Sequence, residues 1–163
     1  MKLNIKKCLP WLAVGIWMVV IFIFSAQTGT VSGDTSGSVT RWLVEHIYIG
    51  FNNLATEQQQ AIMAIAHTVV RKGAHFTEFA ILSAFISNAI RVYNPKKLYK
   101  WLVPIGISAF YAITDEIHQY FVPQRACRLL DVAIDSAGAT FGTAVFIFTV
   151  FLIAKIKNKK ASD

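Results

Sequence analysis

The sequence predicts an all-α integral membrane protein, folded as a four-helix bundle with a short structured extracytoplasmic helical segment. Of its 163 residues, 55% are hydrophobic and only 15% are charged, whereas a soluble domain usually carries about 25% charged residues. The apolar residues also gather in stretches long enough to cross a bilayer, with polar segments between them. We therefore expect one membrane domain over residues 1–163, with spans at about 9–25, 74–90, 101–122 and 129–154.

The first expected span is the uncharged run LPWLAVGIWMVVIFIF, which follows three lysines near the N-terminus. About 17 helical residues extend roughly 26 Å, which is close to the thickness of the hydrocarbon layer. A cleaved signal peptide has the same basic start and apolar core. The run is longer than the usual signal core and no clear small-x-small cleavage site follows it, so we expect an uncleaved helix.

The segment before the second span is expected to lie outside the bilayer, along the membrane surface. Residues 25–38 are rich in Ser, Thr and Gly, which is typical of a loop. Residues 41–53 are apolar on one side and include Trp42 and Tyr48, so they suit a short interfacial helix. Thr56 has the features of a helix N-cap and predicts a further helix.

Basic residues indicate the orientation of the spans. They concentrate in the N-terminal tail, in the connection 91–100 and in the C-terminal tail, where Asp163 is the one opposing acid. Since basic segments stay on the cytoplasmic side, we expect a multi-pass protein of the cell membrane with both termini cytoplasmic and with 26–72 and 123–128 outside. The net charge of +7 is explained by this anchoring, so we expect no nucleic-acid partner.

Carboxylates from three of the expected spans reach a similar depth. Measured along each helix from its outer end, Glu78 lies about 9 Å deep, Asp135 about 10 Å and Asp115 about 12 Å. His75 and His118 lie one turn nearer the surface. Ionisable groups inside a membrane are costly and need partners or a function. The sequence therefore predicts one polar site near the outer face, whereas His46 and His67 receive no role.

Charge balance within the bundle is an alternative explanation for these residues. The outer acids are Glu78, Asp115, Glu116, Asp131 and Asp135, and the outer bases are Arg71, Lys72, Arg125 and Arg128. The five acids nearly balance the four bases in charge, so buried ion pairs can account for most of these residues. In this alternative, Arg125 or Arg128 neutralises Asp135. Two histidines among carboxylates are also ordinary Zn or Mn ligand chemistry, but their spacing matches no local metal motif, so we assign no metal and leave the cofactor undetermined.

Three stretches carry a resemblance: RKGAHFTEFAIL, YAITDEIHQYFVPQR and LLDVAIDSAGATFG. Together with FSAQTG after the first span, they make the chain similar to the VanZ-like family of small bacterial membrane proteins. The shared patterns fall on Lys72, His75, Glu78, Asp115, Glu116, His118, Gln119, Arg125, Asp131, Asp135 and Gly138. Phe79 departs from the family, which often has Tyr there. The resemblance implies a membrane location and a role in the cell envelope, and the family's namesake is associated with low-level resistance to the glycopeptide antibiotic teicoplanin.

These residues define our candidate site. The candidate catalytic residues are His75, Glu78, Asp115, Glu116, His118 and Asp135, and the candidate ligand-binding residues are Lys72, Gln119, Arg125 and Asp131. An amphiphile such as a lipid-linked wall precursor or an acylated glycopeptide fits this set, because arginines hold phosphate or carboxylate groups and His118 or Glu116 can move a proton.

Three classes of function remain open at this stage. The site binds or modifies an amphiphile, or the protein is a non-catalytic interaction or structural protein, or it is a proton-coupled carrier. A carrier is expected to hold ionisable groups near the midplane with access from both sides, which a one-sided cluster does not offer. The sequence contains no nucleophile motif, phosphate loop or redox pair, so it does not decide whether the protein is an enzyme, nor does it give the oligomeric state.

Overall fold

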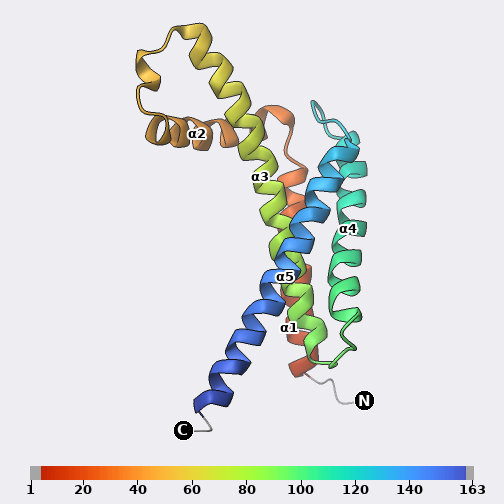
Figure 1. The fold of residues 1–163 in the computed structure, drawn as a ribbon. Coiled ribbons are helices and arrows are strands. Elements are labelled where there is room, and N and C mark those ends of the chain that lie inside the picture. The colour runs from red at the N-terminus through yellow and green to blue at the C-terminus, as the bar shows by residue number, and fades with distance from the viewer. Residues whose placement is uncertain (1–4, 161–163) are drawn as a thin grey trace.

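The computed structural model describes residues 5–160, and all the regular structure in this range is helical (Figure 1). The elements are α1 (Ile5–Ser25), α2 (Gly29–Ile47), the short 3₁₀ helix η1 (Phe51–Asn53), α3 (Thr56–Arg91), α4 (Tyr99–Tyr120) and α5 (Leu129–Lys160). The prediction of an all-α protein is therefore confirmed.

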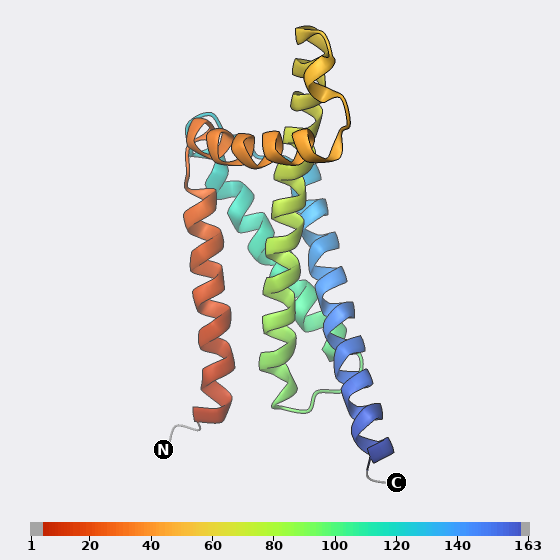
Figure 2. The ribbon, with the colours of Figure 1, turned by 90° about the vertical axis from the view of Figure 1, so that its left-hand side faces the viewer.

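Four helices run alongside one another and a fifth lies across their end. Helices α1, α3, α4 and α5 form the elongated body, while α2 lies across it (Figure 2). We call this the α2 end. The opposite end, which we call the basic end, holds the start of α1, the α3–α4 connection and the end of α5 (Figures 1 and 2).

Two helices within residues 5–160 are long and apolar enough to cross a membrane, and these are α1 and α5. The stretches expected as spans in α3 and α4 are less apolar, because ionisable side chains such as Glu78, Asp115 and Glu116 interrupt them. The four-span topology thus remains a prediction, while two candidate spans are found where the sequence indicated them.

The prediction of a loop at 25–38 is wrong, and the helix expected at 41–53 starts earlier, at Gly29, and ends at Ile47. Helix α2 extends without a break over Gly29–Ile47. Its hydroxyl groups donate to carbonyl oxygens within their own helix: Ser36 Oγ to the Ser32 oxygen at 2.6 Å, and Thr40 Oγ1 to the Ser36 oxygen at 2.6 Å. Because the hydroxyls find partners in the turn before them, a composition typical of loops is compatible with a helix.

Helix α3 is one continuous helix of 36 residues, where the sequence suggested a surface helix and a separate span. It passes through Gly73, and its first half projects beyond the body at the α2 end (Figure 1). Thr56 is the first helical residue and not the N-cap, which is Ala55; the Ala55 N–H donates to Gln58 Oε1 at 3.3 Å. The charged residues near Lys72 therefore lie in mid-helix, on a rigid support.

Small residues let α5 pack closely against α3. Gly138 and Gly142 are buried at this contact, and a Cβ atom on either would clash with the carbonyl oxygen of Phe76 or Ala80, respectively. This close approach brings the acids of α5 next to the basic residues of α3.

Candidate functional site

A cavity of about 240 Å³, which we call the polar cavity, lies where α2 crosses the body. It is lined by Phe24, Ser25 and Gln27 near the end of α1, by Ser32, Ser36 and Val39 of α2, by Val70, Arg71, Ala74, His75 and Glu78 of α3, and by Arg125 from the α4–α5 connection. Residues from four separate parts of the chain therefore share one space.

Arg125 joins the α4–α5 connection to the end of α1. Its guanidinium donates to the carbonyl oxygens of Gln27 (Nε, 3.2 Å) and Phe24 (Nη2, 3.3 Å), and to Gln119 Oε1 (Nη1, 3.4 Å). Burial lowers the pKa of Arg125, and neighbouring Arg71 lowers it further, while Asp115 opposes the shift. Since an arginine keeps its proton in proteins, a positive charge lies on the cavity wall.

Asp115 lies behind the wall of the polar cavity, with 3% of its surface exposed. Ser25 Oγ and Gln119 Nε2 both donate to its Oδ2 atom at 2.8 Å. The carboxylate thus holds Ser25, which lines the cavity, to Gln119, which also contacts Arg125. Asp115 and Gln119 therefore hold Ser25 and Arg125 in place, and it is Ser25 and Arg125 that line the cavity.

The acids of α5 pair with bases of α3. Asp131 lies 3.7 Å from Arg71 Nη2 and 3.8 Å from Lys72 Nζ. Asp135 is fully buried, and its Oδ1 lies 3.8 Å from His75 Nδ1. The charge-balance alternative supposed that Arg125 or Arg128 neutralises Asp135, and no such ion pair is found among the described residues. The close contact between α3 and α5 places His75, and not an arginine, beside Asp135.

Glu116 and His118 do not line the polar cavity. Glu116 Oε2 accepts a hydrogen bond from the Arg128 backbone N–H at 2.8 Å, which ties α4 to the start of α5. The His118 ring packs on Phe22, with 4.5 Å between ring centres. These contacts give both residues surroundings distinct from those of His75 and Glu78.

Glu78 presents its side chain to the polar cavity. Its backbone carbonyl accepts a hydrogen bond from Trp17 Nε1 at 2.9 Å, which fixes this turn of α3 against α1. Within residues 5–160, no hydrogen bond or ion pair engages the Glu78 carboxylate. Of the candidate acids, Glu78 is thus the one that lines the cavity and remains available to a ligand.

Residues 10–152 match the family described as VanZ/LLP1. The chain belongs to the VanZ/LLP1 family. This confirms the resemblance carried by the motifs around His75, Asp115 and Asp135. No curated protein and no solved structure matches the chain significantly.

Sequence reasoning missed the part of this VanZ/LLP1 site that α2 supplies. Ser32 and Ser36 line the polar cavity, and Ser36 Oγ also lies 2.8 Å from His67 Nε2 of α3. His67 received no role from the sequence, yet it holds α2 on α3. The FSAQTG motif was a signal, because it marks the turn into α2 and contains Ser25 and Gln27.

The part of the chain that the structure describes contains no group of three or more His, Cys, Asp or Glu side chains placed to hold a metal ion.

Proposed function

We propose that this VanZ/LLP1 protein is a multi-pass protein of the bacterial cell envelope whose polar cavity binds the anionic head group of an amphiphilic envelope molecule. The observation that carries the proposal is the combination of Arg71 and Arg125 with three hydroxyl groups around one cavity. Guanidinium groups and hydroxyls are suitable donors for phosphate or carboxylate oxygens, and charge-assisted hydrogen bonds are the strongest of these.

The apolar part of such a ligand has a surface to follow. Phe24, Val39 and Val70 contribute apolar lining beside the charged groups. The adjoining side chains Phe22 and Ile23 of α1 are about half exposed, as expected for a helix that faces lipid. A lipid-linked wall precursor or an acylated glycopeptide such as teicoplanin combines the two chemistries, so the proposal includes a link to teicoplanin resistance.

Glu78 and His75 are the residues that would carry out a chemical modification of the bound molecule. They are spaced i, i+3 on α3, and both line the polar cavity. A carboxylate without a protein partner can accept a proton from a ligand held beside it, which is the first requirement of general base catalysis. Binding is our primary proposal, and proton transfer by Glu78 is its catalytic extension.

A second candidate function is purely structural, and the ion pairs of α5 favour it. Asp131 and Asp135 find partners in Arg71, Lys72 and His75 without any ligand. In this interpretation the polar residues balance charge within the bundle, and the protein acts as a membrane interaction or structural protein. These ion pairs leave the position of Glu78 on the cavity wall unexplained, so we prefer the binding function.

The test fills the polar cavity without changing its charge. Ala74→Trp should block the cavity, whereas Ala64→Trp places the same side chain at an exposed position of α3 outside it. Binding to the purified protein in nanodiscs is measured for teicoplanin, for a glycopeptide without an acyl chain and for a polyprenyl phosphate. We expect Ala74→Trp to weaken binding of an amphiphile by about tenfold or more, as loss of a pocket contact commonly does.

The comparison of ligands distinguishes the two envelope molecules. Binding of teicoplanin alone identifies the acylated glycopeptide, and binding of the polyprenyl phosphate alone identifies the lipid-linked precursor. Equal binding by the two tryptophan variants, or equal binding of the glycopeptide that lacks an acyl chain, would contradict the proposal and leave the structural function.

A further inference from the structure

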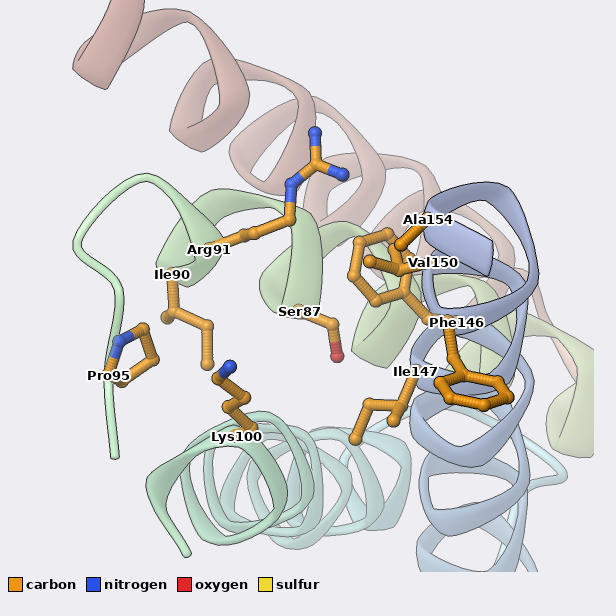
Figure 3. Close-up of a pocket in the computed structure, with 10 residues that line it drawn as sticks. Ser87, Ile90, Arg91, Pro95, Lys100, Phe146, Ile147, Val150 and Ala154 are labelled. Carbon is orange, nitrogen blue, oxygen red and sulfur yellow. The ribbon is translucent and has the colours of Figure 1, made fainter. Parts of the chain in front are cut away.

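A second cavity, of about 250 Å³, lies at the basic end, where α3 stops, α4 begins and α5 passes both. We call it the basic-end cavity. Figure 3 shows Ile90 and Lys100 on one side of it, Phe146, Ile147 and Val150 of α5 on the other, and Ser87 between them. It shares no lining residue with the polar cavity at the α2 end.

The walls of the basic-end cavity are almost entirely apolar. Ile90, Phe146, Ile147 and Val150 supply most of the side chains around it. The neighbouring α5 residue Phe148 is 61% exposed, so the apolar surface continues outward along the helix. An occupant that is apolar along its length and that can enter from the side of the bundle matches this shape.

The rim of the cavity carries positive charge that no acid within residues 5–160 neutralises. Arg91 and Lys100 both line it, and neither forms an ion pair with an acid among residues 5–160. The sequence contains no Asp or Glu from residue 79 to 114 or from 136 to 162. These stretches of α3, α4 and α5 therefore supply no acid to neutralise Arg91 and Lys100. An anionic group that pairs with them must come from elsewhere in the chain or from a ligand.

Ser87 adds a polar group at the inner wall. Its side chain is only 4% exposed, and its hydroxyl has no hydrogen-bond partner among the described residues. A buried hydroxyl without a partner is unfavourable, and a carbonyl oxygen on an occupant would satisfy it. In Figure 3, Ser87 lies between the charged rim and the apolar side chains of α5.

We infer that the basic-end cavity binds an anionic phospholipid. One acyl chain lies against Phe146, Ile147 and Val150, the phosphodiester lies between Arg91 and Lys100, and an ester carbonyl accepts a hydrogen bond from Ser87. The charge complementarity selects an anionic over a zwitterionic lipid, because basic pockets between membrane helices bind such head groups. The inference is independent of the function proposed for the polar cavity.

The experiment measures phospholipid bound to the full-length protein in detergent, by native mass spectrometry with added phosphatidylglycerol or phosphatidylcholine. The double variant Arg91→Gln, Lys100→Gln should lower bound phosphatidylglycerol about tenfold or more, because each cation near an anionic lipid contributes severalfold to binding. The matched control Lys96→Gln, Lys97→Gln removes two charges from the α3–α4 connection, at positions that do not line the cavity. This control should keep the lipid bound.

A second pair of variants tests the acyl-chain site without changing charge. Val150→Trp fills the cavity and should also release phosphatidylglycerol, whereas Val145→Trp, at an exposed α5 position outside the lining, should not. This pair decides the outcome if the charge variant is not monodisperse in size-exclusion chromatography. Equal lipid loss in the controls, equal binding of phosphatidylcholine, or a change of oligomeric state in place of lipid loss would each overturn the inference.

Discussion

Two carboxylates on neighbouring helices differ in what surrounds them. Asp135 is fully buried on α5 next to His75, while Glu78 lines the polar cavity without a hydrogen bond from a described side chain. Burying a charge is costly unless a partner compensates it. At the scale of single residues, neither carboxylate accepts a hydrogen bond from a described side chain, and they differ in access: Asp135 is buried with His75 as its neighbouring base, whereas Glu78 lines the polar cavity.

The pairing of His75 with Asp135 predicts coupled effects of mutation. His75→Gln and Asp135→Asn should each lower the free energy of unfolding, because each leaves its partner buried alone. The double variant should recover part of that loss, giving a coupling energy of about 0.5–3 kcal/mol, the range found for contacting residues. Thermal or denaturant unfolding in detergent measures it for the three variants.

A matched cycle supplies the control. Asp135→Asn combined with His118→Gln joins residues that share no ion pair among the described contacts, so these two effects should add. Strict additivity in the His75 cycle as well would contradict the pairing and return Asp135 to the set of candidate functional residues.

At the scale of helices, the contact between α3 and α5 determines the geometry of the site. Gly138 and Gly142 face the carbonyl oxygens of Phe76 and Ala80, with no space for a Cβ atom. Their spacing of one turn makes a smooth strip along α5. The same contact brings Asp131 and Asp135 to Arg71 and His75, so the position of the charges depends on these glycines.

Gly142→Ala should therefore destabilise the protein by about 1–3 kcal/mol, the usual cost of overpacking a close contact. Gly106→Ala makes the same change on α4, where a Cβ atom meets nothing within 4 Å, and should be neutral or stabilising because Ala is the better helix former. The melting temperatures of the two variants in one detergent give the comparison. A Gly142→Ala protein that melts with or above the Gly106→Ala protein would show that α3 and α5 are not closely packed there.

At the scale of the whole molecule, the two ends of the bundle differ in chemistry. The α2 end carries the candidate acids and the polar cavity, whereas the basic end carries the cations of the α3–α4 connection and of the end of α5. Since basic segments remain in the cytoplasm, the polar cavity is predicted to face outward.

Reporter fusions test this orientation. A periplasmic or extracellular reporter enzyme should be active when fused after Gly50, in the turn between α2 and η1, or after Gln124 in the α4–α5 connection. It should be inactive after Lys97, in the α3–α4 connection. Activity at Lys97 would reverse the topology, and with it the proposed access of envelope molecules to the polar cavity.

The sequence by itself determined the class of the protein, its family and part of its candidate site. Apolar stretches indicated α1 and α5, and the motifs around His75 and Asp115 indicated the VanZ-like family. These properties follow from composition and spacing along one helix, which local sequence encodes directly.

Only the tertiary structure decided which residues meet. Distance along a helix gave the depth of Asp135 but not the direction in which it points, so its partner became His75 and not an arginine. Arg125 reaches the carbonyls of α1, and Ser36 reaches His67, across long separations in the chain. Such contacts depend on how helices rotate and cross, and these are set by packing over the whole bundle.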